Sequence, residues 1–217
     1  MWLLLKYTLL YAAVLMLVAL GGMFSERSGV INIALEGIMV IGGLMGVIMI
    51  NMLNAAGVPI FLAIVISILL SAVAGMAYSS MLAFSAINLK ADQTIGGTAL
   101  NLLATAVAMV IAKRINGSDS PKITYSTNTN AWFNASHFSF NVGPLTLNWF
   151  LLVTAIAVAL AWFILYRSRF GMRLMACGEH PQAAASVGVN VFKMRWAGVL
   201  TWLPLTGPGE AAGEAPA

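Results

Sequence analysis

The stretch LTLNWFLLVTAIAVALAWFILY, residues 145–166, is an uncharged apolar run, and RSRFGMRLMACGEHPQAAASVGVNVFKMR, Arg167–Arg195, follows it directly. A bilayer-spanning helix needs about 20 predominantly apolar residues, so the first part predicts a membrane span. The second part holds five of the eleven Lys and Arg residues of the chain and one acidic residue, Glu179. A basic polar segment at the end of a span is typical of a cytoplasmic loop.

The composition predicts an integral membrane protein. The 217 residues are 60% hydrophobic and 8% charged, whereas a soluble domain carries about 25% charged residues. The net charge of +4 does not indicate a nucleic-acid partner, because the basic residues lie at the edges of apolar runs and are better explained as topology signals. The single cysteine, Cys177, lies in the basic loop, so an intramolecular disulfide is excluded.

The apolar runs predict an all-α fold, a polytopic integral membrane helix bundle with about five full spans and a partial sixth. The five predicted spans cover residues 7–24, 29–53, 55–89, 95–112 and 145–166. The third run is too long for one upright helix, so it holds either one tilted span with an interfacial piece or a break near Gly75. The partial sixth span runs from Trp196 to Leu205 and is too short to cross a bilayer.

The segments between and after the spans predict the topology. Residues 115–143 are rich in Asn, Ser and Thr, which predicts an extracytoplasmic loop. If residues 167–195 form a cytoplasmic loop, five simple spans place the N-terminus outside. An extra crossing or a re-entrant segment within 29–53 or 55–89 would reverse that orientation. After Leu205 the composition changes abruptly, which favours a truncated or frame-shifted product.

Glu36 is an acidic residue inside the second predicted span. A carboxylate there costs about 2.5–3.5 kcal/mol on insertion scales, so it should face the bundle interior or a water-filled path. Asn32 precedes it by four residues and would share its face on a helix. We expect Asn32 and Glu36 to line a translocation path. The alternative is a structural carboxylate bonded to a neighbouring helix end or to Arg27.

Polar residues also surround the start of the fourth predicted span. Asp92, Gln93 and Thr94 come just before Ile95. Asp or Thr at this place is a good helix N-cap, but the positive end of the helix could instead face a polar substrate. Asn101 is polar within an apolar run and is a further candidate for the path. Asp92, Gln93 and Asn101 therefore join Asn32 and Glu36 as candidate substrate-path residues.

The basic loop resembles a known motif. Gly178 and the residues after it predict a turn and then a short helix, with Pro181 at its first position and Gly188 at its end. From composition alone, the loop could be a solvated connector. However, RFGMRLMACGEHPQAAASVGVNVFKMR resembles the cytoplasmic coupling segment of ABC importer permeases of the branched-chain amino acid, simple sugar and nucleoside class. The resemblance implies that the segment docks into a groove of the ATP-binding subunit. The implied ATPase-coupling residues are Arg167, Phe170, Gly171, Arg173, Ala176, Gly178, Glu179, Ala183, Ala184 and Gly188.

Two further blocks narrow the resemblance. GGMFSERSGVINIALEGIMVIGG, Gly21–Gly43, and LKADQTIGGTALNLLA, Leu89–Ala104, resemble blocks of the nucleoside-type permeases. The resemblance covers roughly residues 21–200. We therefore expect a partial permease domain over residues 1–205 and a tail outside the family pattern, 206–217, that is disordered.

The resemblance implies a permease subunit of an ATP-driven importer that carries nucleosides across the bacterial cytoplasmic membrane. It also implies ATP-binding cassette subunits, a second permease subunit and an extracytoplasmic substrate-binding lipoprotein as partners. The sequence has neither a phosphate-binding loop nor a His/Cys cluster, so we expect no metal, no cofactor and no enzymatic activity of its own, with ATP and Mg²⁺ held by the partners. The alternatives are a simple-sugar or branched-chain amino acid permease, an ion-coupled secondary transporter that uses Glu36 and Asp92, and a non-functional remnant.

Overall fold

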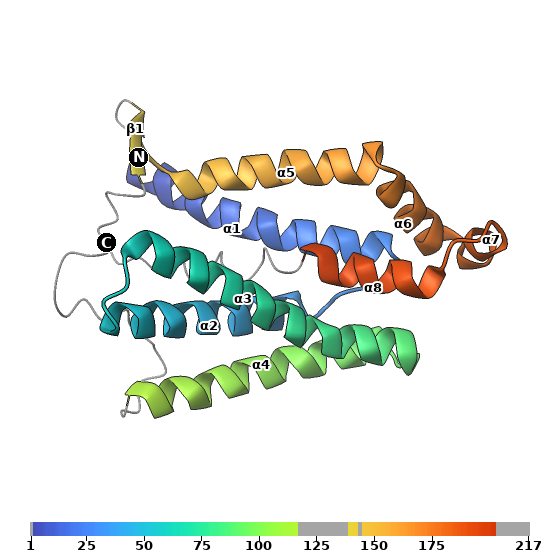
Figure 1. The fold of residues 1–217 in the computed structure, drawn as a ribbon, viewed down its shortest axis with the longest axis horizontal. Helices are drawn as coiled ribbons and strands as arrows, with labels where there is room; N and C mark the ends of the chain where they lie inside the picture. The colour runs from blue at the N-terminus through green and yellow to red at the C-terminus, as the bar shows by residue number, and fades with distance from the viewer. Residues whose placement is uncertain (1, 117–138, 143–144, 203–217) are drawn as a thin grey trace.

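The computed structural model describes residues 2–116, 139–142 and 145–202 (Figure 1). Helices account for nearly all of this part of the chain. Their bounds are α1 Trp2–Arg27, α2 Leu35–Ala55, α3 Ile60–Ala83, the π-helix η1 Phe84–Asn88, α4 Gln93–Asn116, α5 Trp149–Arg167, α6 Arg169–Glu179, α7 Pro181–Ser186 and α8 Val191–Trp202. Two short strands, β1 Ser139–Val142 and β2 Leu145–Asn148, form an antiparallel hairpin before α5.

The long helices lie side by side, and two apolar clusters hold them together (Figure 1). The first cluster joins α1, α5 and α6 through Leu17, Phe24, Ala157, Ala161, Leu165 and Leu174. The second joins the start of α2 to α3 and α8 through Val30, Ala34, Ile38, Leu82, Ala83 and Val199. α4 packs against α2. Helix α8 contacts α1, α3 and α6, so it connects the two parts of the bundle.

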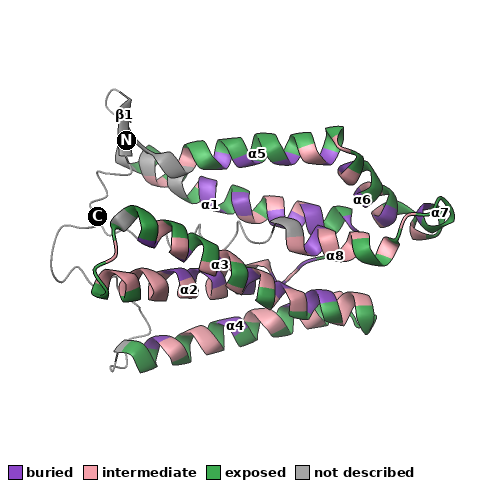
Figure 2. Ribbon diagram, viewed as in Figure 1, coloured by how far each residue is buried: buried purple, intermediate pink, exposed green. Residues whose placement is uncertain are grey.

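The described helices confirm the predicted membrane bundle. Four are long and apolar enough to cross a membrane: Tyr7–Arg27, Leu35–Ala55, Phe61–Asn88 and Gln93–Ile115. A fifth span is obtained if α5 and α6, which are bent by 70° from one another, are taken together. Buried residues lie mostly where helices face one another (Figure 2), and many of the exposed residues are large and hydrophobic. Lipid can solvate these apolar surfaces, so the chain is a multi-pass membrane protein.

Most of the third predicted span, from Ile60 to Asn88, is one continuous helical segment. The helix α3 passes through Gly75 without interruption and continues into η1, and the 28 residues from Phe61 to Asn88 are about 42 Å long at 1.5 Å per residue. The alternative of a break near Gly75 is therefore wrong. Because the hydrocarbon core is only about 30 Å thick, this segment must tilt or project beyond it.

The start of the fifth span also differs from the prediction. Residues 145–148 form strand β2, and the helix begins at Trp149. Most of the predicted loop 115–143 lies outside the described residues. The start of α1 and the hairpin lie at one end of the bundle, and α7 lies at the other (Figure 1). This arrangement agrees with five simple spans, and the described residues contain no extra crossing.

Candidate functional site

The chain leaves the helical conformation between α1 and α2, in residues 28–34, which we call the α1–α2 break. Gly29 has φ +83°, a left-handed conformation that favours glycine. The Ser25 hydroxyl donates to the Val30 carbonyl oxygen at 2.8 Å and stabilises the turn. Beyond the turn, burial alternates, and the even-numbered residues up to Ala34 are buried. The break is therefore a non-helical segment with one side buried against the protein, where non-helical backbone is tolerated in a membrane protein.

Asn32 lies in this break and not on a helix. The prediction that Asn32 and Glu36 share a helical face is therefore wrong, because α2 begins only at Leu35. The Asn32 side chain is 4% exposed, and its Oδ1 accepts from the Ala34 N–H at 3.1 Å. Its Nδ2 is buried without a hydrogen-bond partner in the described structure. An unsatisfied buried donor is costly, so this amide is suited to a polar ligand atom.

Glu36 lies in the first turn of α2 and is exposed. A negative charge near a helix N-terminus is favoured by the helix dipole. Among the described residues no ion pair joins it to Arg27, so that alternative is not found. An exposed carboxylate on a membrane helix needs a water-filled path or a polar partner surface.

Two other candidate path residues, Gln93 and Asn101, use their side-chain amides to hold the break. Gln93 Oε1 accepts from the Ile31 N–H at 2.7 Å. Asn101 Oδ1 accepts from the Gly37 N–H at 2.8 Å, and its Nδ2 donates to the Ile33 carbonyl oxygen at 2.8 Å. Both residues belong to α4 and lie more than sixty positions after the backbone groups that they bind. They position the break, and the sequence did not reveal this role.

Asp92 is the N-cap of α4. Its Oδ1 accepts from the Thr94 N–H at 2.8 Å and from the Ile95 N–H at 3.3 Å. These bonds satisfy two of the free N–H groups at the helix start. The N-cap interpretation is therefore confirmed for Asp92.

The predicted coupling segment folds into α6 and α7, and α7 lies at one extreme of the bundle (Figure 1). Ser168 caps α6, because its hydroxyl oxygen accepts from the Gly171 N–H at 3.1 Å. Pro181 occupies the first turn of α7 and Gly188 follows with φ +83°, which confirms the predicted short helix. The exposed members of the predicted ATPase-coupling set are Arg167, Arg173, Ala176, Glu179, Ala183 and Gly188. Phe170 and Gly178 are half-buried, and Gly171 and Ala184 are buried.

Two glycines of that set face the backbone of their own chain. A Cβ on Gly171 would collide with the carbonyl oxygens of Ile164 and Leu165. A Cβ on Gly178 would collide with the carbonyl oxygen of Arg27. Gly198, in α8, was not singled out from the sequence, but its Cβ would lie 2.5 Å from the Cβ of Ser28. Helices α6 and α8 thus meet the α1–α2 break at close range.

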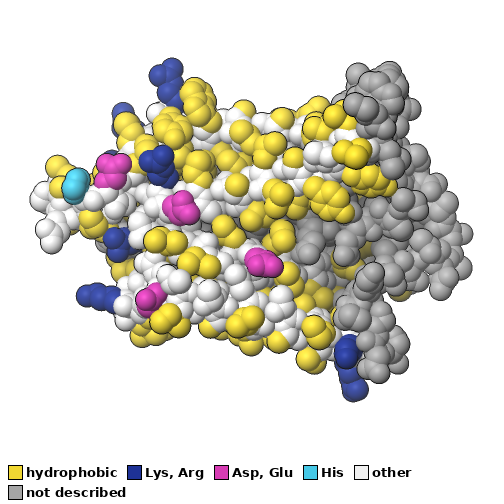
Figure 3. Space-filling view, turned by 180° about the vertical axis from the view of Figure 1, so that it is seen from behind, with side chains coloured by type: hydrophobic (Ala, Val, Ile, Leu, Met, Phe, Trp, Pro, Cys, Tyr) yellow, Lys and Arg dark blue, Asp and Glu magenta, His cyan; other side chains and the backbone are white. Residues whose placement is uncertain are grey.

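Basic residues are concentrated at the end of the molecule that carries α7. Most of the basic side chains that Figure 3 shows lie at the end of the bundle that carries α7, together with acidic side chains. Arg27 at the end of α1 and Lys90 before α4 add to the five basic residues of 167–195. This basic end contains the segment that the sequence predicts to be a cytoplasmic loop.

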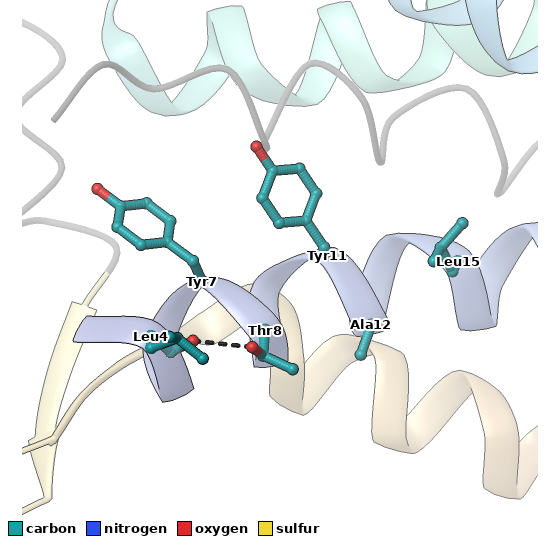
Figure 4. A pocket seen from close by; sticks show the side chains of 6 residues that line it. All are labelled: Leu4, Tyr7, Thr8, Tyr11, Ala12 and Leu15. Carbon is teal, nitrogen blue, oxygen red and sulfur yellow. Dashed lines mark hydrogen bonds between the residues drawn. The ribbon is translucent and has the colours of Figure 1, made fainter. Parts of the chain in front are cut away.

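A shallow surface groove of about 630 Å³ lies along the first half of α1, away from the break. In Figure 4 the rings of Tyr7 and Tyr11 point to the same side of the helix. The lining is mostly apolar and consists of Leu4, Tyr7, Thr8, Tyr11, Ala12 and Leu15. The groove brings together none of the predicted site residues. Within the described part of the chain, no group of three or more His, Cys, Asp or Glu side chains could hold a metal ion.

The chain is similar in sequence to known proteins. The family described as branched-chain amino acid transport system / permease component matches residues 4–201. The chain is 40% identical over 205 residues to the guanosine ABC transporter permease protein NupQ of Bacillus subtilis, covering 89% of this chain and 61% of the relative. It is 37% identical over 209 residues to the nucleoside ABC transporter permease protein NupC of Lactococcus lactis, covering 94% and 64%. It is 33% identical over 208 residues to the putative glucose ABC transporter permease protein TsgC13 of Haloferax volcanii, covering 91% and 58%.

The chain spans about three fifths of the length of these relatives. No solved structure matches it significantly. The family match extends over nearly all the described residues, from α1 to α8, and includes both the break and the coupling segment. The chain therefore belongs to the branched-chain amino acid transport system / permease component family.

Proposed function

We propose that this protein is a permease subunit of an ATP-driven importer that carries nucleosides across the bacterial cytoplasmic membrane. The single observation that carries the substrate class is the similarity to a guanosine permease and a nucleoside permease, at 40% and 37% identity over most of the chain. The basic α7 end fits the cytoplasmic side of that membrane. The chain would then begin on the extracytoplasmic side.

The proposed partners divide the work of transport. ATP-binding cassette subunits bind ATP and Mg²⁺ and contact α7, which lies at one end of the bundle (Figure 1) and exposes Ala183. A second permease subunit covers part of the exposed surface and completes the path. An extracytoplasmic lipoprotein delivers the nucleoside.

The α1–α2 break supplies the proposed substrate contact. The free Nδ2 of Asn32 can donate to an acceptor on the base or the ribose, and Glu36 can accept from a hydroxyl. Gln93 and Asn101 act through the break because their amide oxygens are engaged with its backbone and with the first turn of α2.

Uptake into right-side-out vesicles tests the proposed function. Right-side-out vesicles that contain the chain and its partner subunits should take up labelled guanosine when ATP is supplied inside. A protonophore should leave this uptake unchanged while internal ATP is maintained, because ATP hydrolysis drives it. Leucine or glucose uptake in place of guanosine would contradict the nucleoside assignment. Uptake that collapses with the proton gradient would show an ion-coupled transporter.

Asn32→Leu tests the substrate contact. Loss of one hydrogen bond worth about 1–1.5 kcal/mol should raise the KM for guanosine roughly five- to tenfold. Asn54→Leu, at the opposite end of α2, is the matched control and should leave KM unchanged. Equal KM values for the two variants would show that Asn32 does not contact the substrate.

A further inference from the structure

The α1–α2 break is held at its start by α6 and α8. A Cβ on Gly29 would lie 3.2 Å from the Cα of Gly178 and 3.4 Å from the Arg195 guanidinium. A Cβ on Gly198 would lie 2.5 Å from the Cβ and 2.9 Å from the hydroxyl oxygen of Ser28. We call Gly29, Gly178 and Gly198 the glycine contact. At each of these positions, the absence of a side chain lets α6 or α8 touch the break.

The end of the break is held by a different element. The amides of Gln93 and Asn101 on α4 bond the backbone of Ile31, Ile33 and Gly37. Gly97, on the same helix, brings α4 close, because its Cβ would lie 2.9 Å from that of Ile33. Asn32 therefore lies between a contact with the coupling segment and a contact with α4.

We propose that the glycine contact transmits displacement of α7 to Asn32 and so couples the ATPase partners to the substrate path. Only His180 separates α6 from α7, and Gly178 lies in the last turn of α6. Close-packed backbone cannot absorb a displacement by compressing. Movement of α7 therefore shifts the start of the break relative to the end that α4 holds. This inference rests on the proposed function.

A purely structural role makes a different prediction. If the glycine contact only packs the helices, enlarging it reduces the amount of assembled transporter, and uptake and ATP hydrolysis fall together. If the glycine contact transmits movement, uptake per ATP hydrolysed falls. The ratio of these two rates distinguishes the two roles, whatever the amount of protein.

The main test uses Gly198→Ala in the assembled transporter, reconstituted in proteoliposomes. Guanosine uptake and ATP hydrolysis are measured on the same samples. We expect uptake per ATP hydrolysed to fall about tenfold, equivalent to about 1.4 kcal/mol of coupling. Gly178→Ala should change the ratio in the same direction. Gly96→Ala is the matched control, because its Cβ meets the nearest atom only at 3.6 Å, and the ratio should stay at the wild-type value.

A second substitution on the other side of the contact provides the rescue. Ser28→Gly removes the Cβ that an alanine at position 198 would meet. In the double variant with Gly198→Ala, uptake per ATP hydrolysed should return close to the wild-type value. An unchanged ratio in Gly198→Ala, or a reduced ratio that the second substitution fails to raise, overturns the inference.

Cysteine labelling gives a readout that is independent of uptake. The native Cys177 is buried, so its background labelling should be slow. In Asn32→Cys, ATP should change the rate of maleimide labelling. Adding Gly198→Ala should abolish that change, and an equal ATP response in both proteins overturns the inference. If the wild-type transporter shows no ATP-dependent guanosine uptake, the proposed function itself is contradicted.

Discussion

Gly171→Ala is expected to destabilise the protein by about 3 kcal/mol, at the upper end of the usual range for overpacking. The added methyl group would meet the carbonyl oxygens of Ile164 and Leu165 and the carbonyl carbon of Leu165 at 2.6 Å. These atoms belong to the backbone of α5 and cannot rotate away as a side chain can. The 70° bend between α5 and α6 must therefore open.

Opening the bend also removes the cap of α6, because the Ser168 hydroxyl bonds both the Gly171 N–H and the Ile164 carbonyl oxygen. The midpoint of thermal unfolding in detergent measures the loss of stability. Gly96→Ala is the control, because it adds the same methyl group to a helix without a close contact. Equal midpoints for the two variants would show that the α5–α6 bend does not depend on the glycine.

The parts of the fold that local signals encode were predictable. Pro181 and Gly188 bound a short helix, because one suits a helix start and the other accepts a left-handed conformation after its end. Asp92 caps α4 through the N–H groups two and three positions further on. Such interactions lie within a few residues, so the sequence alone contains them.

The α1–α2 break could not be predicted from apolarity. Residues Gly29–Ala34, GVINIA, are as apolar as a helix interior, so a span beginning at residue 29 was the natural prediction. The segment can be non-helical because side chains of α4 satisfy its backbone at Ile31 and Ile33. These partners are more than sixty residues away, and no local pattern indicates the pairing.

The packing roles of the glycines in the coupling segment could not be predicted from the sequence either. The resemblance assigned Gly171 and Gly178 to docking with the ATPase, a role that remains a proposal. The structure adds contacts with α5 and with the α1–α2 break, which require the tertiary fold. The start of α5 was misjudged for a similar reason, because Leu145–Asn148 pairs with β1 instead of extending the helix.

Asn101→Leu is expected to destabilise the protein by about 3 kcal/mol, because it leaves two backbone groups without partners. The Gly37 N–H is one of the free donors at the start of α2, and Ala34, at the N-cap position, provides no side-chain cap. Asn101 supplies that cap from another helix and also binds the Ile33 carbonyl oxygen. Without the Asn101 side chain, the start of α2 and the break are no longer fixed in position against α4.

The same change should abolish ATP-dependent guanosine uptake, because Asn32 lies one residue before Ile33 and moves with it. Thr98→Val is the matched control on α4: its hydroxyl bonds only carbonyl oxygens of its own helix, at 2.9 and 3.0 Å, and its loss should cost about 0.5 kcal/mol or less. Asn101→Asp keeps the acceptor for the Gly37 N–H but turns an oxygen toward the Ile33 carbonyl oxygen. Its stability should therefore lie between those of Asn101→Leu and Thr98→Val. If Asn101→Leu unfolds at the same temperature as Thr98→Val and transports normally, Asn101 does not hold the break, and the position of Asn32 must depend on Gln93 and the glycine contact.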